Sequence, residues 1–156
     1  MAYQTYNYTL DGGTQLKDAG LVAASAAGTV SAAATYVDLG AANAYAEFDV
    51  VVDWTACEIA SNDELYTIEV QGSDTTAFTL DYVLAQKDLG AVEVLVDPVD
   101  TAATGRVVLH CDNAVVTSAT DPNSVAGCRY IRVFCRVAGT VATGINYTAY
   151  LVPKSG

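Results

Sequence analysis

Residues 45–54 read YAEFDVVVDW and alternate between apolar and acidic side chains. Successive side chains of a β-strand point to opposite faces of its sheet, so this period of two predicts a strand over Tyr45–Trp54. We expect one face to pack into a hydrophobic core and the other to be an acidic face in contact with water. The core face would hold Ala46, Phe48, Val50, Val52 and Trp54, and the acidic face Glu47, Asp49, Val51 and Asp53.

The same rhythm returns along the rest of the chain, between segments rich in glycine, asparagine and aspartate. Further strands are predicted over Leu65–Gln71, Phe78–Gln86, Ala91–Val96, Arg106–Cys111, Cys128–Val137 and Thr143–Val152. A turn is expected at 87–90 and a long loop at 112–123. Pro98 lacks a backbone hydrogen-bond donor, so 91–96 is expected to be an edge strand. The last two strands are expected to pair as a hairpin.

The segment from Asp18 to Thr35 is rich in alanine, serine and glycine. Gly20 and Gly28 interrupt it and no apolar stripe of helical period is present, so we predict extended structure and not a helix. Its small side chains suit either an arm lying close to a neighbouring subunit or a flexible lead-in to the first strand. We therefore divide the chain into an N-terminal arm and lead-in, residues 1–34, and one domain, residues 35–156.

The spacing of the predicted strands indicates the fold class. About eight short strands without intervening helices, roughly a dozen residues apart, predict an all-β protein. The expected architecture is an antiparallel β-sandwich of jelly-roll type with an extended N-terminal arm. With 156 residues, 52% of them hydrophobic, the chain can bury one sizeable core.

Charge and hydropathy argue against two classes of partner. The formal net charge is −11, from 18 acidic and 7 basic residues, and such a surface repels the phosphate backbone of nucleic acids. No stretch reaches the roughly 18 consecutive apolar residues that span a bilayer. The sequence therefore predicts no nucleic-acid partner and no membrane partner.

The chain offers little for catalysis or metal binding. Its single histidine, His110, stands beside Cys111, and adjacent strand residues point to opposite faces, so the two cannot form a catalytic dyad. The four cysteines lack C-x-x-C spacing, and we expect free buried thiols, with a Cys111–Cys128 bridge as the alternative. Pairs of loop aspartates are more typical of turns than of calcium sites. These pairs are Asp97 with Asp100 and Asp112 with Asp121. We expect no cofactor, no metal and no enzymatic activity.

Ten tyrosines favour protein binding, because tyrosine offers a large contact area with a polar tip at low entropic cost. The N-terminal stretch is expected either to anchor on another subunit or to form an extra edge strand, in both cases through Tyr3, Tyr6 and Tyr8. In the strand at 128–137, a second set of large side chains shares the face opposite Ile131 and Val133. This candidate interface on the strand consists of Tyr130, Arg132, Phe134 and Arg136.

Two blocks of sequence resemble one protein family. The C-terminal block is Arg129-Tyr130-Ile131-Arg132-Val133, then Val137-Ala138-Gly139, a small-residue turn to Thr143-Gly144, and Tyr147-Thr148-Ala149-Tyr150-Leu151-Val152. The N-terminal block is Lys17-Asp18-Ala19-Gly20-Leu21-Val22, a run of small residues, and Thr35-Tyr36-Val37-Asp38-Leu39-Gly40. In order and spacing these blocks resemble the jelly-roll cement, or decoration, proteins of tailed-bacteriophage capsids. The chain departs from that pattern at Phe134, Cys135 and Asn146.

The resemblance implies a structural virion protein that needs no catalytic residue. Such a protein binds the outside of the capsid as a homodimer or homotrimer near symmetry axes and stabilises adjacent subunits of the major capsid protein. It would be assembled in the host cytoplasm and lie on the outer capsid surface of the virion.

Two other functions compete with this interpretation. A carbohydrate-binding jelly-roll module of a phage or bacterium is the first alternative, but its sugar platform would depend on Trp54, which the alternation assigns to the core. A cupin-type enzyme is the second, but it builds its metal site from several histidines.

Overall fold

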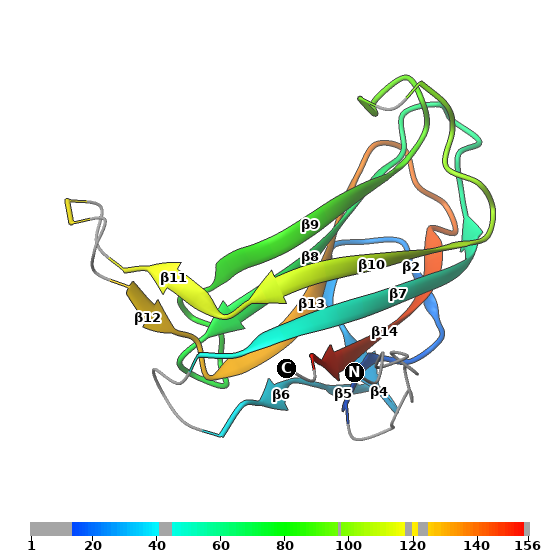
Figure 1. Ribbon diagram of the computed structural model, residues 1–156. Coiled ribbons are helices and arrows are strands. Elements are labelled where there is room, and N and C mark those ends of the chain that lie inside the picture. Colours follow the sequence, from blue (N-terminus) through cyan, green and yellow to red (C-terminus); the bar gives the residue numbers. More distant parts are fainter. Residues whose placement is uncertain (1–13, 41–44, 97, 118–119, 122–124, 155–156) are drawn as a thin grey trace, which may run out of the picture.

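The structure is a computed structural model in which residues 14–40, 45–96, 98–117, 120–121 and 125–154 are described. Two antiparallel sheets lie face to face with one hydrophobic core between them (Figure 1). No α-helix occurs in these ranges. Consequently none of the described residues forms a helix that could cross a membrane. The all-β fold predicted from the alternation is confirmed.

The first sheet, called the β7 sheet here, is built around the strand that opens the sequence analysis. Its strands, in order, are β1 (Gln15–Lys17), β14 (Ile145–Pro153), β7 (Glu47–Cys57) and β10 (Gly105–Asp112), with β2 (Leu21–Val22) also paired to β14. Strand β7 is central, because β14 pairs along one edge and β10 along the other. Its position explains why its core face is apolar over most of its length.

The second sheet, called the β8 sheet here, carries the candidate interface strand. Its order is β3 (Ala26–Ala27), β13 (Tyr130–Ala138), β8 (Leu65–Ser73) and β9 (Tyr82–Gly90), with β6 (Val37–Asp38) also paired to β13. Two small hairpins complete the described structure. They are β4 (Thr29–Val30) with β5 (Ala33–Ala34), and β11 (Ala114–Val116) with β12 (Val125–Gly127), the latter projecting beyond the sandwich in Figure 1.

The described residues form fourteen strands, more than the eight or so that were expected. Six of the additional elements come from residues 15–38, where each strand is only two or three residues long. Strands β1 and β2 pair with β14, and β3 and β6 pair with β13, so this part of the chain contributes to both sheets. The extended structure predicted for Asp18–Thr35 is confirmed, and no helix forms there.

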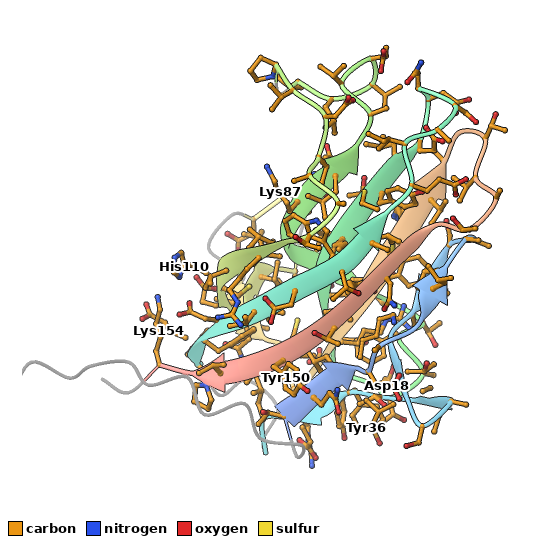
Figure 2. All side chains as sticks on the ribbon, turned by 90° about the vertical axis from the view of Figure 1, so that its right-hand side faces the viewer. Asp18, Tyr36, Lys87, His110, Tyr150 and Lys154 are labelled. Carbon is orange, nitrogen blue, oxygen red and sulfur yellow. The ribbon has the colours of Figure 1, made fainter. Side chains whose placement is uncertain are left out.

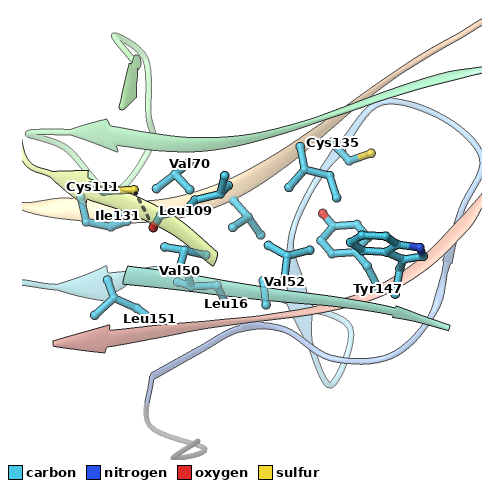
Figure 3. Packing of buried hydrophobic residues seen from close by; sticks show 14 of the residues in the cluster. Leu16, Val50, Val52, Val70, Leu109, Cys111, Ile131, Cys135, Tyr147 and Leu151 are labelled. Carbon is cyan, nitrogen blue, oxygen red and sulfur yellow. Dashed lines mark hydrogen bonds between the residues drawn. The ribbon is translucent and has the colours of Figure 1, made fainter. Parts of the chain in front are cut away.

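Side chains from both sheets fill the space between them (Figure 3). Val50 and Val52 of β7 lie opposite Val70 of β8 and Ile131 of β13, and all four are fully buried. Each such side chain stabilises the fold by about 1.5–3 kcal/mol through removal of apolar surface from water. Trp54 also belongs to this core, and its Nε1 donates a hydrogen bond to the Ala102 carbonyl at 2.9 Å. Its predicted core position is confirmed.

The four cysteines are free thiols, as predicted, and no Cys111–Cys128 bridge is present. Cys111, Cys128 and Cys135 are buried in the core. Burial raises the pKa of Cys111 and of Cys135 to about 12, because the thiolate would lose its hydration. Burial likewise raises the pKa of Cys57 and of Cys128 to about 11. At neutral pH these groups stay protonated and act as small apolar side chains.

Two predicted strands in the middle of the chain are wrong in position or type. The strand expected at Phe78–Gln86 begins at Tyr82 and runs through the expected turn at 87–90, because residues 82–90 find backbone partners along β8. The edge strand expected at Ala91–Val96 is a turn, in which the amides of Val94 and Leu95 donate to the Ala91 carbonyl. The long loop expected at 112–123 begins with β11, whose partner β12 follows it.

The predicted hairpin between the last two strands is also wrong. Strand β13 pairs with β8, β3 and β6, whereas β14 pairs with β7, β1 and β2, so the two lie in opposite sheets. The connection through 139–144 therefore crosses from one layer of the sandwich to the other. Sequence proximity of the two strands favoured a hairpin, but each strand pairs along its whole length with a strand elsewhere in the chain, β13 with β8 and β14 with β7.

Two carboxylates hold this crossing connection in place. Glu58 Oε2 accepts hydrogen bonds from the amides of Ala142, Thr143 and Gly144 at 3.0, 2.7 and 2.8 Å. Asp63 binds the other end of the connection by accepting the amide and the hydroxyl of Thr140, both at 2.9 Å. The hydrogen bond from Gly144, followed by that from Thr143, lowers the pKa of Glu58 below its usual value.

This lowered pKa predicts a pH-dependent contribution to stability. A carboxyl group whose pKa is lower in the folded than in the unfolded state stabilises the fold above the unfolded value, near 4.5, and loses that effect as the pH falls through the folded value. We expect Glu58→Gln to lower the melting temperature at pH 7 and to differ less from wild type at pH 3. Thermal melts between pH 3 and pH 7 measure this. A difference that stays constant across that range would contradict the role of the Glu58 charge.

Candidate functional site

The structure places one part of the predicted interface on the outer side of the β8 sheet. In β13 the burial alternates residue by residue, with Ile131, Val133 and Cys135 facing the core. The opposite face presents the predicted set of Tyr130, Arg132, Phe134 and Arg136. The predicted sharing of one strand face is confirmed. The other predicted interface residues, Tyr3, Tyr6 and Tyr8, lie outside the described residues.

Strand β8 supplies polar partners for this row. The register of β13 with β8 places Arg132 opposite Gln71 and Phe134 opposite Glu69. Arg136 Nε donates to Glu69 Oε1 at 2.6 Å, Gln71 Nε2 donates to Glu69 Oε2 at 2.7 Å, and Arg132 Nε donates to Gln71 Oε1 at 2.8 Å. Four side chains from two strands therefore form one continuous hydrogen-bonded network.

The centre of this network is removed from water although it lies on an outer face. Glu69 is 5% exposed and Gln71 is 0% exposed. Buried polar groups are costly unless they are hydrogen-bonded, and here each buried group has at least one partner in the network. The hydrogen bond from Arg136 to Glu69 raises the pKa of Arg136, which keeps its positive charge fixed beside the carboxylate.

Aromatic rings alternate with the arginines along the same face. The guanidinium carbon of Arg132 lies 4.3 Å from the ring centre of Phe78 and 5.3 Å from that of Phe134. Arg136 lies on Phe134 as well, at 5.2 Å. Cation–π contacts at these distances are worth about 0.5–2 kcal/mol each, so they help to fix the orientation of both guanidinium groups.

A second cluster continues the face at the start of β13. Arg129 donates from Nε and Nη2 to the two carboxylate oxygens of Asp38 at 2.8 and 3.0 Å, and its guanidinium lies 5.2 Å from the Tyr130 ring. Tyr36 meets Tyr130 edge to face, with ring centres 5.3 Å apart. The bidentate hydrogen bond from Arg129 lowers the pKa of Asp38. This pair stays ionised at neutral pH.

We call this surface the arginine–aromatic face. It consists of Tyr36, Asp38, Glu69, Gln71, Phe78, Arg129, Tyr130, Arg132, Phe134 and Arg136. The sequence predicted the four residues of β13, and it included Arg129 only in the C-terminal block that resembles the cement proteins. It missed Glu69 and Gln71 because the register of β13 against β8 is not encoded locally. Phe78 was predicted as the first residue of a strand, but it lies in the loop before β9 and packs on Arg132.

The middle of the outer side of the β7 sheet is less exposed than predicted. Asp49 is 4% exposed and Val51 is 1% exposed, which corrects the expectation of an acidic face in water. The reason is that β7 is central, so side chains of β10 and β14 flank its outer face. His110 Nδ1 lies 2.6 Å and Lys154 Nζ 3.9 Å from Asp49 Oδ1. Figure 2 shows His110 and Lys154 at the same end of this sheet.

Cation pairing extends along this outer face, where Arg106 binds the carboxylate of Asp53 through Nε and Nη2 at 2.6 and 2.8 Å. His110 points to this side, whereas Cys111 points into the core, so the two do not share a face.

A crevice of about 530 Å³ opens between β9 and the β10–β11 segment and is lined by Tyr82, Val83, His110 and Val116 among others. Among the described residues, no group of three or more histidine, cysteine or acidic side chains could hold a metal ion.

The candidate functional site is therefore a surface, the arginine–aromatic face, and not a cavity. The arginine–aromatic face presents oriented guanidinium groups and aromatic rings. Trp54 lies in the core, so it offers no exposed platform for a sugar ring. In comparisons with known proteins, no protein-family model and no curated protein sequence matches this chain.

Proposed function

We propose that this chain is a structural protein of a tailed-phage virion, which binds the outside of the capsid and cements adjacent subunits of the major capsid protein. The observation that carries the proposal is the arginine–aromatic face on the β8 sheet. Arginine, tyrosine and phenylalanine are enriched where proteins bind one another, and tyrosine and arginine recur among the residues that dominate binding energy.

The pairing of charges on this face suits burial against another protein. Arg129 is neutralised by Asp38 and Arg136 by Glu69 within the chain itself. Covering a charge that lacks a partner costs several kcal/mol, whereas an already paired and hydrogen-bonded charge can be covered at much lower cost. The face can thus enter an interface with most of its charges satisfied in advance.

Its rigidity supports the same function. Stacked guanidinium groups and a buried hydrogen-bonded network leave the side chains of β13 little rotameric freedom to lose on binding. A homodimer or homotrimer would present several such faces at once, and multivalent attachment raises the avidity of each contact. The arm residues Tyr3, Tyr6 and Tyr8 would add contacts to a neighbouring subunit.

Two further features fit a protein on the outer capsid surface. The antiparallel two-sheet architecture is compatible with the proposed jelly roll, in which strands from different parts of the chain alternate between layers. A net charge of −11 disfavours attachment to packaged or free DNA. The proposed place of action is the virion surface, after assembly in the host cytoplasm.

The proposal predicts selective binding to assembled shells. Purified protein is expected to bind expanded empty capsids of the phage that carries the gene, saturably and at a fixed ratio to capsid subunits. It is not expected to bind unassembled major capsid protein, because the complete binding surface exists only between neighbouring subunits. Co-sedimentation and a cryo-EM map of the decorated particle measure this. Equal binding to both forms, or to neither, would refute the proposed function.

A further inference from the structure

Arg132 differs from the other three arginines in its partner. Arg106, Arg129 and Arg136 each bind a carboxylate of the chain, at Nε–O distances of 2.6, 2.8 and 2.6 Å. Among the described residues, Arg132 has no carboxylate as a hydrogen-bond partner, and its Nε donates to the side-chain amide oxygen of Gln71 at 2.8 Å. In a chain with 18 acidic and 7 basic residues, most cations can find an internal carboxylate. Arg132 is therefore the arginine with unused capacity for an anion.

The unused capacity lies on the terminal nitrogens of the guanidinium group. Its Nε is occupied by Gln71, while Nη1 and Nη2 have no acceptor among the residues that the structure describes. Phe78 and Phe134 lie close to the guanidinium carbon, at 4.3 and 5.3 Å. Aromatic contacts of this kind occupy the faces of a guanidinium and leave its N–H edge available for a hydrogen-bonding partner.

The surroundings keep this edge in one orientation. Gln71 is fully buried and is itself fixed by its hydrogen bond to Glu69. Phe78 is buried although its φ of 50° lies in the left-handed region, which costs a non-glycine residue about 1–2 kcal/mol. The contacts of Phe78 must offset this cost, and the stacking on Arg132 is one of them. A preoriented donor pair loses little entropy when a ligand binds.

Because Arg132 is partly buried, an anion that binds it gives a larger stabilisation than at a fully exposed arginine. Loss of hydration lowers the pKa of Arg132, in spite of the opposing effect of Asp81 nearby. A carboxylate that docks on the two terminal nitrogens would replace the lost hydration with charge-assisted hydrogen bonds. Such bonds are about twice as strong as those between neutral groups.

The local charges favour one carboxylate over a chain of phosphates. Asp38, Glu69 and Asp81 lie on or close to the same face and act electrostatically on its arginines. A polyanion such as DNA would meet these carboxylates together with the chain's net charge of −11. A single aspartate or glutamate on a protein surface carries one charge, so it meets much less of that repulsion when it reaches Arg132.

We propose that Arg132 is a preformed receptor for one carboxylate side chain of a protein partner, bound through Nη1 and Nη2 between the rings of Phe78 and Phe134. The identification of the partner as a protein rests on the proposed function, since the carboxylate would then belong to a capsid subunit. The chemistry of the receptor stands on the contacts of Arg132 alone.

The test uses the full-length ¹⁵N-labelled protein and N-acetylglutamate N-methylamide as the carboxylate probe. The Nε–Hε signals of the four arginines are followed by NMR while the probe is added, with N-acetylglutamine N-methylamide as the uncharged control. We expect a saturable shift that is largest for Arg132, smaller for Arg106, Arg129 and Arg136, and absent with the glutamine probe. Arg132→Gln should abolish the response while leaving the amide signals of the β7 sheet unchanged, which shows that the variant is folded.

Three outcomes would overturn the receptor. These are equal shifts of all four arginines, no shift with the glutamate probe, and a response to inorganic phosphate but not to the carboxylate. Particle binding separates this failure from that of the proposed function. A protein that binds capsids but shows no Arg132 response would disprove the carboxylate receptor and leave cementing intact. A protein that shows the response but binds no capsid would disprove cementing and leave the receptor intact.

Discussion

Arg132→Ala is expected to weaken binding to expanded capsids by about 30-fold, which corresponds to the roughly 2 kcal/mol that defines a hot-spot residue. The substitution removes the one guanidinium group of the arginine–aromatic face that has no hydrogen-bonded carboxylate among the described residues. It also removes the cation that lies on Phe78 and Phe134. Titration of fluorescently labelled protein onto a fixed amount of capsid measures the change in affinity.

Two further variants separate binding from folding. Arg106→Ala also removes a surface arginine, but from the outer side of the β7 sheet, and it should leave capsid affinity unchanged. Arg132→Lys keeps the charge but loses the planar pair of terminal donors, so its affinity should lie between those of wild type and Arg132→Ala. Urea unfolding reports whether Gln71, which loses its donor, destabilises the variant. Wild-type affinity of a folded Arg132→Ala protein would show that the interface lies elsewhere.

Gly144→Ala is expected to destabilise the fold by about 3 kcal/mol or more, because a left-handed conformation and a backbone collision act together. Gly144 has a φ of +89°, and a Cβ placed there would lie 1.9 Å from the carbonyl oxygen of Val22. Strand β2 would have to leave β14 to relieve the contact, since Val22 pairs with Ile145. Urea denaturation followed by tryptophan fluorescence measures the loss in free energy of unfolding.

Gly40→Ala is the matched control for this substitution. Gly40 also has a left-handed φ, +99°, but no heavy atom of the described residues lies within 4 Å of its would-be Cβ. This variant should therefore cost only the conformational term, about 1–2 kcal/mol. Similar losses in the free energy of unfolding for the two variants would mean that the collision of the introduced Cβ with the Val22 carbonyl adds nothing. Slower amide exchange of Val22 in wild type than in Gly144→Ala would locate the damage in β2.

The periodicity of the sequence was sufficient for the positions and faces of most long strands. Tyr45–Trp54, Leu65–Gln71 and Arg106–Cys111 lie within or within two residues of strands β7, β8 and β10. A residue's face depends only on its parity along an extended strand, which is a local property. For the same reason the sharing of one face by Arg132 and Phe134 was predictable without any knowledge of their neighbours.

Periodicity failed where long-range pairing or loop structure decided the outcome. Residues 87–90 resemble a turn in composition, yet they extend β9 because β8 offers them partners, including Thr67, whose hydroxyl donates to Asp88 at 2.7 Å. Residues 91–96 are apolar, yet they turn at the end of the sandwich. In both places the contacts of the folded state outweighed local preference.

By itself, the sequence determined that this protein is built from antiparallel strands with one apolar face each, and that Tyr130, Arg132, Phe134 and Arg136 lie together. Only the tertiary structure decided what surrounds them. The register of β13 on β8 brings Gln71 and Glu69 beside the arginines, and the loop before β9 brings Phe78 onto Arg132. Alternation is set residue by residue, whereas strand register and loop placement depend on contacts between segments that are about sixty residues apart in the chain.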